Sequence, residues 1–420
     1  MNIILFGISR CGKNYFIERL LENINNKVIN TLYYVSGSGT LDKYSRDKFG
    51  IPLKDTEEWQ KNELRFMFCD ELVKHNNDYQ HKIVDGHYCF CKNDNFEIAF
   101  TDKDRDVYDI FFYLDTPASV IIEQANKDEI KKDVAFMTEE KINLWKKFEI
   151  QSLREIAIKY EKEFVILDNS IEDSIDYFEA MLLGKNDMLL NSKLIAEHII
   201  KKNEKLINEN KNVILLDCDR TISDNDTTYD FCNSIGIDKQ KLKNIFSGEH
   251  YTLYQFFRAA KLYAEKDIPM YERASVDAFG KAVLNASLIE DIKQNGKKHL
   301  TIGITSGIFK IWEKIQDKHK FPCFIAGGSN IKIDKIIVSR SVKYYLVKLL
   351  KKRGKYIIAV GDSMVDIDML KEADEGFIVA QEKINKSVDI YLKSNKTEIK
   401  QLEYNKKYYE GILIKRSLFL

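Results

Sequence analysis

The chain alternates short apolar runs with longer segments in which apolar residues recur at helical spacing. Segments such as 15–24 and 344–350 carry apolar side chains every three or four positions, which is typical of amphipathic helices. Between such segments lie apolar runs of strand length, at 1–6, 82–85, 109–115, 164–168, 213–217, 300–304 and 356–360. Strands that alternate with helices predict an α/β fold built on parallel sheets.

Two aspartates follow the apolar run over 213–216. Asp217 and Asp219 occupy alternate positions, and Thr221 continues the alternation. Alternate side chains of an extended segment point the same way, so these groups can converge on one small volume. Two carboxylates held that close repel each other unless a cation lies between them. The tripeptide alone could equally be the polar end of a buried strand, but the polar residues that follow later strands favour a divalent metal site.

Further polar residues follow the strands predicted at 300–304 and 356–360, and a lysine opens the amphipathic run between them. These residues are, in chain order, Thr305, Ser306 and Gly307, then Lys343, and then Gly361, Asp362 and Asp366.

Taken in order, Asp-x-Asp-x-Thr, a strand-end Ser or Thr, a Lys and Gly-Asp-x-x-x-Asp resemble the four-motif signature of the haloacid dehalogenase-like (HAD) phosphatases. The resemblance covers residues 211–400 and is similar in detail to the phosphoserine phosphatases, which carry a helical insert between the first two motifs. It implies a Rossmann-like α/β domain with a small helical cap at about 222–290, a magnesium ion as cofactor, and hydrolysis of a small phosphorylated substrate.

The resemblance also implies a role for each matching residue. Asp217 would attack phosphorus and form an aspartyl-phosphate, while Asp219 would protonate the leaving oxygen and then activate water. Ser306 and Lys343 would hold the phosphoryl oxygens, with Thr305 and Lys348 as the alternatives. The implied metal ligands are Asp217, Asp219, Asp362 and Asp366, and the implied substrate contacts are Thr221, Asp226, Arg258, Thr305 and Gly307.

Within the cap, Asp226 lies where the phosphoserine phosphatases place the acid that meets the substrate amine. Their cap arginine has no clean match, because Arg258 is shifted by about half a helical turn, and this weighs against phosphoserine itself. The cap also carries aromatic residues that either stack on a base or sugar or form the cap's own core: Tyr251, Tyr254, Phe256, Phe257 and Tyr263.

The first apolar run leads directly into a glycine-rich loop and a helix. Gly7, Gly12 and Lys13 fit the pattern Gly-x-x-x-x-Gly-Lys between a strand and a helix, which is the context of a phosphate-binding loop. Backbone N–H groups would cradle the phosphates of ATP, and Lys13 would reach the outer ones. Residues 1–183 resemble the small P-loop kinases of the nucleoside-monophosphate and adenylate kinase group. The implied nucleotide contacts are Gly7, Arg10, Gly12, Lys13, Asn14 and Asp85.

Two features depart from these kinases. Asn14 stands where they carry the Ser or Thr that ligates magnesium. The stretch over 120–135, which corresponds to their lid, contains Lys127, Lys131 and Lys132 but no arginine. Lysine supplies charge without the planar fork of arginine. The P-loop domain is therefore either a kinase or a nucleotide-sensing domain that regulates the phosphatase.

Composition sets wider limits. The chain has 420 residues, with 65 Lys and Arg balanced by 65 Asp and Glu, and this balance argues against a nucleic-acid partner. There is no apolar run of about 18 residues to cross a membrane. The seven scattered cysteines fit a cytoplasmic protein better than a disulfide framework. The predicted domains are 1–183, a connecting helix at 184–210, the phosphatase domain at 211–400 and a tail at 401–420; the oligomeric state is left open.

Three functions are compatible with the sequence. The first is a magnesium-dependent phosphomonoesterase for a small metabolite, fused to a nucleotide-binding, kinase-like domain. The second is a nucleic-acid end-healing enzyme that resembles the polynucleotide kinase-phosphatases. The third is a phosphatase regulated by a P-loop domain that binds nucleotide without catalysis.

Overall fold

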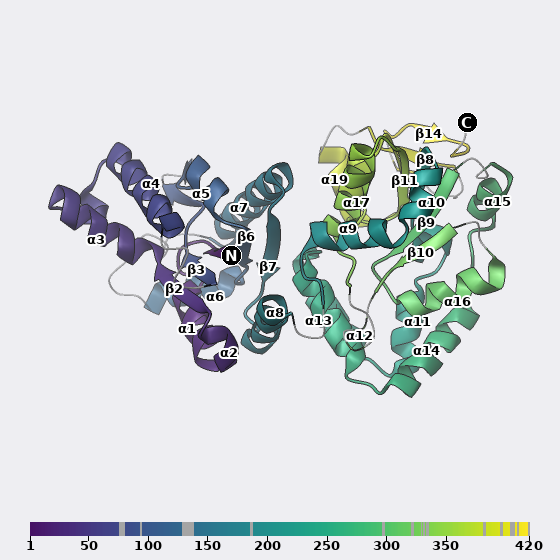
Figure 1. The fold of residues 1–420 in the computed structure, drawn as a ribbon, viewed down its shortest axis with the longest axis horizontal. Helices are drawn as coiled ribbons and strands as arrows, with labels where there is room; N and C mark the ends of the chain where they lie inside the picture. The colour runs from purple at the N-terminus through teal and green to yellow at the C-terminus, as the bar shows by residue number, and fades with distance from the viewer. Residues whose placement is uncertain are drawn as a thin grey trace. The chain divides into compact units, whose positions relative to one another are not determined.

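The computed structural model describes residues 1–74, 80–92, 95–127, 138–184, 188–295, 299–320, 323–328, 330, 332, 336–380, 384–394, 398–403, 408–409 and 411–418. The chain forms two compact units, Met1–Leu183 and Gly184–Leu420. Each unit is built on a parallel sheet flanked by helices (Figure 1), so the predicted α/β class with parallel sheets is confirmed. Of the lid residues, Lys131 and Lys132 lie outside the described residues.

The first unit has a five-stranded sheet in the order β2-β3-β1-β6-β7. All of its strand pairs are parallel. The chain leaves the central strand β1 toward one edge and later returns to its other side, so β1 lies where the strand order reverses. Its strands are β1 (Asn2–Phe6), β2 (Leu32–Ser36), β3 (His81–Asp85), β6 (Ile110–Leu114) and β7 (Glu163–Leu167), with a separate antiparallel hairpin of β4 (Cys89–Lys92) and β5 (Asn95–Ile98).

Helices lie on both sides of this sheet (Figure 1). The strands β1, β6 and β7 are buried at every position, which explains their near-continuous apolar sequence. The helices are α1 (Lys13–Asn23), α2 (Asn26–Ile29), α3 (Gly37–Phe49), α4 (Glu58–Lys74), α5 (Asp102–Val107), α6 (Ala118–Lys127), α7 (Glu139–Tyr160) and α8 (Ile171–Leu183).

The second unit has a seven-stranded parallel sheet in the order β10-β9-β8-β11-β12-β13-β14. Here β8 lies where the strand order reverses, and the carboxyl ends of parallel strands at such a point are the usual place for a ligand. The strands are β8 (Asn212–Asp217), β9 (His299–Thr305), β10 (Cys323–Gly327), β11 (Tyr356–Gly361), β12 (Glu375–Ile378), β13 (Lys400–Leu402) and β14 (Ile414–Lys415).

The cap is a group of four helices inserted between β8 and β9: α11 (Thr227–Ile235), α12 (Lys239–Ile245), α13 (Leu253–Ala264) and α14 (Ile268–Lys281). Its two connections to the sheet pair with each other. Asp224 N–H donates to Val283 O at 2.7 Å, and Asn285 N–H donates to Ile222 O at 2.8 Å. The cap is therefore fixed at its base by backbone hydrogen bonds.

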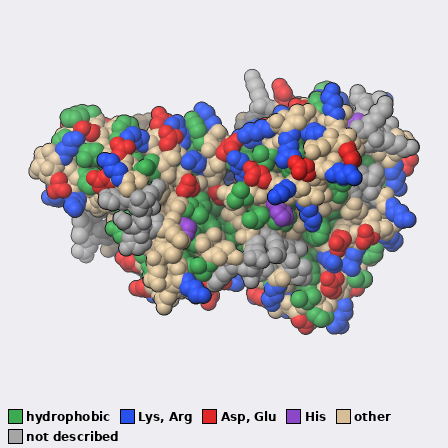
Figure 2. Space-filling view, viewed as in Figure 1, with side chains coloured by type: hydrophobic (Ala, Val, Ile, Leu, Met, Phe, Trp, Pro, Cys, Tyr) green, Lys and Arg blue, Asp and Glu red, His purple; other side chains and the backbone are tan. Residues whose placement is uncertain are grey.

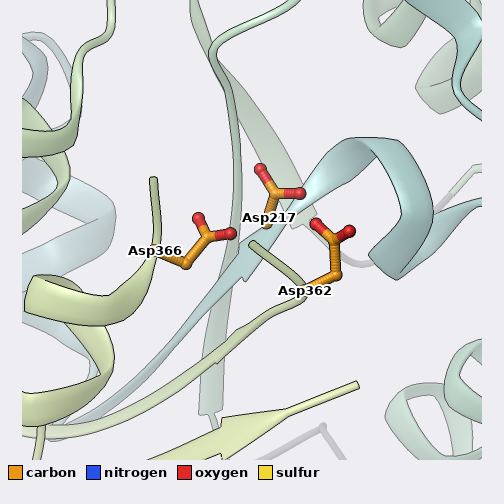
Figure 3. A group of neighbouring side chains, drawn as sticks. All are labelled: Asp217, Asp362 and Asp366. Atoms are coloured by element: carbon orange, nitrogen blue, oxygen red, sulfur yellow. The ribbon is translucent and has the colours of Figure 1, made fainter. Parts of the chain in front are cut away.

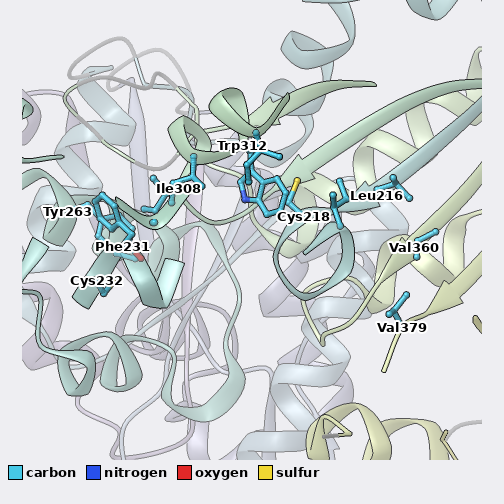
Figure 4. Packing of buried hydrophobic residues seen from close by; sticks show 14 of the residues in the cluster. Leu216, Cys218, Phe231, Cys232, Tyr263, Ile308, Trp312, Val360 and Val379 are labelled. Carbon is cyan, nitrogen blue, oxygen red and sulfur yellow. The ribbon is translucent and has the colours of Figure 1, made fainter. Parts of the chain in front are cut away.

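One hydrophobic cluster joins the cap to the sheet (Figure 4). Leu216 and Val360 contribute to it from β8 and β11, while Phe231 and Tyr263 contribute from the cap, and fully buried Trp312 belongs to the same cluster. The rings of Phe231 and Tyr263 pack edge to face with centroids 5.7 Å apart. A hydrophobic core shared in this way fixes the position of the cap on the sheet.

The remaining helices of the second unit are α9 (Ser192–Lys202), α10 (Glu204–Glu209), α15 (Ala286–Asn295), α16 (Phe309–His319), α17 (Arg340–Lys352), α18 (Ile367–Glu372) and α19 (Lys386–Ser394). The predicted connecting helix is thus two helices, α9 and α10, and both belong to the second unit. The tail supplies β14 to the sheet, and Ser417 Oγ donates to Asp291 of α15 at 2.9 Å.

On the face shown in Figure 2, Lys and Arg side chains are interspersed with Asp and Glu over each unit, in keeping with the equal counts in the sequence. Within the described ranges, none of the helices is both long enough and apolar enough to cross a membrane.

Candidate active site

Three aspartates converge at the carboxyl edge of the second sheet (Figure 3). Asp217 is the last residue of β8, Asp362 follows β11, and Asp366 precedes α18. One carboxylate oxygen from each lies within 4.8 Å of the others, and all three residues are buried. The sequence predicted all three as metal ligands, and the topology brings them together.

Lys343 lies among these carboxylates, in the first turn of α17. Its Nζ donates to Asp217 Oδ1 at 2.5 Å and to Asp366 Oδ1 at 2.7 Å, and the side chain is only 1% exposed. The competing residue, Lys348, is elsewhere, with its ammonium over the ring of Tyr344 at 5.6 Å from the centroid. Of the two lysines, Lys343 is therefore the one that contacts the aspartates.

The charges of this cluster do not balance. If all three carboxyl groups were ionised, they and the one ammonium would leave a net charge of −2 in a buried site. Burial and the neighbouring Asp366 raise the pKa of Asp217 to about 7, and burial and Asp217 raise the pKa of Asp362 well above its ordinary value. Burial lowers the pKa of Lys343, but the carboxylates of Asp217 and Asp366 outweigh it and raise that pKa. A divalent cation with a preference for oxygen ligands would neutralise the excess charge, so these residues fit a magnesium ion.

Asp366 and the helix that follows it are fixed by neighbouring groups. Ser363 N–H and Ser363 Oγ donate to Asp366 Oδ2 at 3.1 and 2.8 Å. Arg340 of α17 makes two hydrogen bonds of 2.6 Å to the carboxylate of Asp368 in α18. This buried bidentate pair ties the helix that carries Lys343 to the helix that begins just after Asp366.

Asp219 is held apart from the three-carboxylate cluster. Its Oδ1 accepts hydrogen bonds of 2.6 Å from both Thr227 N–H and Thr227 Oγ1, at the start of α11. Asp219 is thus not among the three carboxylates that lie within 4.8 Å of one another, and its role as a metal ligand stays a prediction. Burial raises the pKa of Asp219, and the hydrogen bonds from Thr227 partly oppose the rise.

Ser306 and Thr305 differ in what their hydroxyl groups contact. Thr305 Oγ1 accepts from Gly307 N–H at 2.9 Å, which fixes the turn after β9. Ser306 Oγ is buried in the cavity wall and has no hydrogen-bond partner among the described residues. A buried hydroxyl without a partner is costly unless a ligand completes it. Ser306 is therefore the group available to a bound phosphoryl oxygen.

Gly307 is required by close packing at this turn. A Cβ atom at this position would lie 2.6 Å from Asp219 Oδ2 and 2.3 Å from Thr228 Oγ1. The residue lines the cavity. Nearby, Thr221 Oγ1 donates to Asp217 Oδ2 at 3.4 Å. Thr221 therefore contacts the aspartate, and its predicted contact with substrate stays a prediction.

Asp226 lies in the cavity and pairs with Arg220 at 3.4 Å. Burial and the charge of Asp219 raise the pKa of Asp226 to about 7. Arg258 is not among the residues that line the cavity, and its guanidinium lies over the ring of Tyr254 at 5.5 Å. The structure therefore does not bring Arg258 to the cavity wall, and its role as a substrate contact stays a prediction.

Sequence reasoning missed several residues that shape the site. Arg220 adopts a left-handed backbone conformation with φ of 58° between the two halves of the turn. Thr227 donates a hydrogen bond to the carboxylate of Asp219, and Ser363 donates one to that of Asp366. The run Asp226-Thr227-Thr228 carries the signal of a helix N-terminus, which could have indicated its place beside the site.

The first unit places its glycine-rich loop between β1 and α1. Gly12 and Arg10 have positive φ angles of 89° and 64°, and Lys13 begins the helix. Lys13 Nζ donates to Gly7 O at 2.6 Å and to Ile8 O at 3.3 Å, so the loop curls around the ammonium. Arg10 donates to Ala125 O at 3.3 Å.

The remaining predicted nucleotide contacts, Asp85 and Asn14, lie outside the loop itself. Asp85 ends β3, the neighbour of β1, and its Oδ1 accepts from Tyr34 Oη at 3.0 Å and Gly37 N–H at 2.9 Å. Asn14 is exposed in the first turn of α1. The loop and Asp85 thus share the carboxyl edge of two adjacent strands.

An unpredicted acid lies buried in the same unit. Glu149 of α7 is fully buried, and its Oε1 accepts from Cys89 N–H at 3.1 Å. Burial raises the pKa of Glu149 to about 7, although Cys89 N–H and the charge of Lys13 oppose the rise. Helical spacing places Glu149 on the same face of α7 as the buried residues Ile142, Trp145 and Leu153, a signal that the sequence analysis did not use.

Comparisons with known proteins give limited information. No protein-family model matches the sequence, and no curated protein sequence matches it significantly. Among solved structures, a phospho-aspartyl intermediate analogue of phosphoserine phosphatase is similar over 45% of this chain and 92% of its own, with 20% identity and a TM-score of 0.34. A HAD family hydrolase from Salmonella enterica serovar Typhi covers 47% of this chain and 68% of its own, with 17% identity and a TM-score of 0.35.

A phosphoserine phosphatase from T. onnurineus covers 50% of this chain and 91% of its own, with 17% identity and a TM-score of 0.30. Identities and TM-scores of this size do not decide the function.

The net negative charge of the aspartate cluster predicts that magnesium stabilises the second unit. Adding Mg²⁺ at about 100 times its dissociation constant should stabilise that unit by about 2.7 kcal/mol. The Asp362→Asn variant should lose this magnesium-dependent shift, whereas the control Asp277→Asn, at an exposed position of α14, should keep it. Differential scanning calorimetry with and without Mg²⁺ measures the shift. Equal shifts in both variants would show that the cluster does not bind the ion.

Burial of Glu149 predicts that the first unit loses stability as pH rises. The pKa is about 7 in the folded chain against 4.5 ordinarily, so the folded state binds the extra proton between these values. Stability should fall through this window by about 3 kcal/mol. Hydrogen exchange of the α7 amides can be compared between Glu149→Gln and wild type at each pH. The variant should exchange more slowly than wild type, and this difference should be larger at pH 8 than at pH 5.

The exposed acid Glu155, on the same helix, provides the matched control as Glu155→Gln. A gain in protection at pH 8 that is the same for both variants would contradict a specific effect of burial at Glu149.

Proposed function

We propose that the second unit is a magnesium-dependent phosphomonoester hydrolase of the HAD type that acts through an aspartyl-phosphate. The observation that carries the proposal is the position of Asp217 at the end of the central strand, hydrogen-bonded to buried Lys343 at 2.5 Å and beside Asp362 and Asp366. The four-motif signature of the sequence supports the same family. The structural similarities are in keeping with it but carry no weight of their own.

In the first half-reaction, a carboxylate oxygen of Asp217 forms a bond to phosphorus while the bond from phosphorus to the ester oxygen breaks. Asp219 donates its proton to the departing oxygen, and its raised pKa favours the protonated form that this step requires. Lys343 and Ser306 hold the phosphoryl oxygens as negative charge develops on them. A bound magnesium ion would supply positive charge at the aspartate cluster and keep Asp217 ionised.

In the second half-reaction, Asp219 accepts a proton from water, and the water oxygen attacks the phosphorus of the aspartyl-phosphate. The phosphorus–oxygen bond to Asp217 breaks, which releases inorganic phosphate and restores the carboxylate. Because Thr227 fixes Asp219 through two hydrogen bonds, the same carboxyl group is positioned for both proton transfers.

The cavity beside these residues favours a small substrate. Cap residues such as Tyr229, Lys243 and Phe246 line it together with the catalytic groups. A cap over the site suits a small phosphoester better than the end of a nucleic-acid strand, so the end-healing function is the less favoured alternative.

We further propose that the first unit binds a nucleotide such as ATP through the loop that ends at Lys13. Support comes from the glycine-rich pattern between β1 and α1, the positive φ angles that let the loop curl, and its place where the strand order reverses. Whether the unit transfers phosphate or regulates the phosphatase is decided by turnover of the bound nucleotide.

Replacing the nucleophile should abolish hydrolysis. Asp217→Asn should lower phosphate release by at least about 1,000-fold because the neutral amide cannot form the covalent intermediate. The control Asp277→Asn, at an exposed cap position, should retain wild-type activity. Phosphate release is measured with magnesium over phosphorylated amino acids, sugars, nucleotides and 3′-phosphorylated oligonucleotides. Near-normal hydrolysis by Asp217→Asn would exclude the mechanism, and activity confined to oligonucleotide ends would favour end healing.

Replacing the loop lysine should weaken nucleotide binding. Lys13→Ala removes the positive charge that would meet the outer phosphates, so the affinity for ATP should fall by at least about tenfold. Isothermal titration calorimetry measures the affinity, and the control Lys27→Ala changes an exposed lysine of α2. Unchanged ATP affinity in Lys13→Ala would refute the proposed site, and ATP turnover that depends on Lys13 would exclude a purely sensing role.

A further inference from the structure

The cavity at the candidate active site has two chemically different ends. Its volume is about 420 Å³, which is within the range of pockets that hold small organic ligands. One end carries the charged and hydroxyl groups of the sheet, including Asp217, Ser306 and Lys343. The other end is formed by the cap and is rich in aromatic side chains: Tyr229, Phe246, Tyr251, Phe256 and Tyr263. A phosphoryl group fills only the polar end.

Phe246 is the centre of the aromatic end. Its ring lies 5.0 Å from the ring of Phe256 and 6.0 Å from that of Tyr251, and the Phe246 and Tyr251 rings are within 27° of parallel. Phe246 and Tyr251 are only half-buried, whereas Phe256 is 7% exposed. Phe246 thus contributes a half-buried aromatic surface to the cavity wall, next to which a flat ligand can pack.

Not all of the cap's aromatic residues share this position. Tyr254 and Phe257 are buried and do not line the cavity. Tyr251, Phe256 and Tyr263 line it, and Tyr263 also belongs to the hydrophobic cluster that joins the cap to the sheet. Neighbouring positions of α13 differ in this way because successive side chains of a helix face in different directions.

The charged groups at the cap end do not suit a free amino acid. Such a leaving group needs a cation for its carboxylate and an acceptor for its ammonium. Arg220 and Asp226 line the cavity but pair with each other at 3.4 Å, and Arg258 is outside it. The remaining cation of the cap end, Lys243, is exposed. The cap end is thus predominantly an aromatic surface.

We infer that the phosphomonoester hydrolysed at this site carries a flat aromatic or heteroaromatic ring on its leaving group, which stacks on Phe246 and its neighbours while the phosphoryl group meets Asp217. The inference rests on the proposed phosphatase function. Two sources supply this chemistry, a nucleobase on a nucleoside 5′-monophosphate and a ring attached directly to the phosphate-bearing carbon, as in pyridoxal 5′-phosphate.

A matched pair of substrates isolates the ring. Uridine 5′-monophosphate and ribose 5-phosphate share the sugar and the phosphoester but differ in the base. Stacking of a base on an aromatic side chain raises affinity by roughly 10- to 100-fold, so kcat/KM should be higher for the nucleotide by this factor. Adenosine 5′-monophosphate and pyridoxal 5′-phosphate distinguish the two sources of the ring.

Variants of Phe246 test whether stacking causes the preference. Phe246→Leu keeps an apolar side chain without a flat face, so the ratio of kcat/KM for uridine 5′-monophosphate over ribose 5-phosphate should fall by at least about fivefold. Phe246→Tyr retains the ring and should preserve the ratio. Circular dichroism melting of both variants shows whether the cap remains folded.

The outcomes separate this inference from the function it rests on. Hydrolysis that depends on Asp217 but is equal for ribose 5-phosphate and the ring-bearing esters, or that favours phosphoserine, overturns the inference and leaves the phosphatase function intact. A ratio unchanged in Phe246→Leu also overturns it. If none of these phosphomonoesters is hydrolysed in a reaction that requires Asp217, both are overturned.

Discussion

The second unit depends on one buried ion pair network, the contact of Lys343 with Asp217 and Asp366. A single buried ammonium balances only one of three carboxylates, so the other two carboxyl groups must either bind protons or share a bound cation. Removing one partner from a buried charge network is strongly destabilising because the others are left uncompensated. The protein therefore keeps charged groups in its interior at an energetic cost, which is the usual sign of a functional site rather than a structural one.

The parallel sheet and its neighbouring helices hold these four charged residues in a defined arrangement. The cluster draws one residue from β8, two from the segment after β11 and one from α17, and the bidentate pair of Arg340 and Asp368 fixes α17 against α18. Parallel strands place all of their carboxyl ends on one edge, so groups far apart in sequence meet without any long loop. The first unit uses the same principle for the loop of Lys13 and for Asp85, at the ends of adjacent strands.

Residues at strand ends were predictable from the sequence, and residues that depend on packing between elements were not. Asp217, Asp362 and Asp366 follow apolar runs, and parallel topology then requires them to meet. The position of Arg258 depends on the rotation of α13, which the sequence pattern does not define to within half a turn. Burial of Glu149 depends on contacts between α7 and the segment at Cys89, which lies 60 residues earlier in the chain.

The tail and the segment before β8 also illustrate the limits of sequence patterns. A strand as short as β14 carries no periodic signal, and its pairing with β13 is decided by a sheet edge that already exists. The predicted connecting helix is two helices that belong to the second unit, because amphipathic spacing shows that a face is apolar without showing what covers it.

The closed base of the cap has a consequence for the order of folding. Asn212 of β8 and His299 of β9 are 87 residues apart in the chain, and bringing such distant strands together opposes folding through loop-closure entropy. Contacts within the cap, such as the packing of α11 on α14, span shorter stretches of chain than this, and its two connections meet at the pairing of Ser223 with Leu284. A cap that folds first holds the ends of β8 and β9 near each other, so this insertion also acts as an internal guide for pairing the central strands of the sheet.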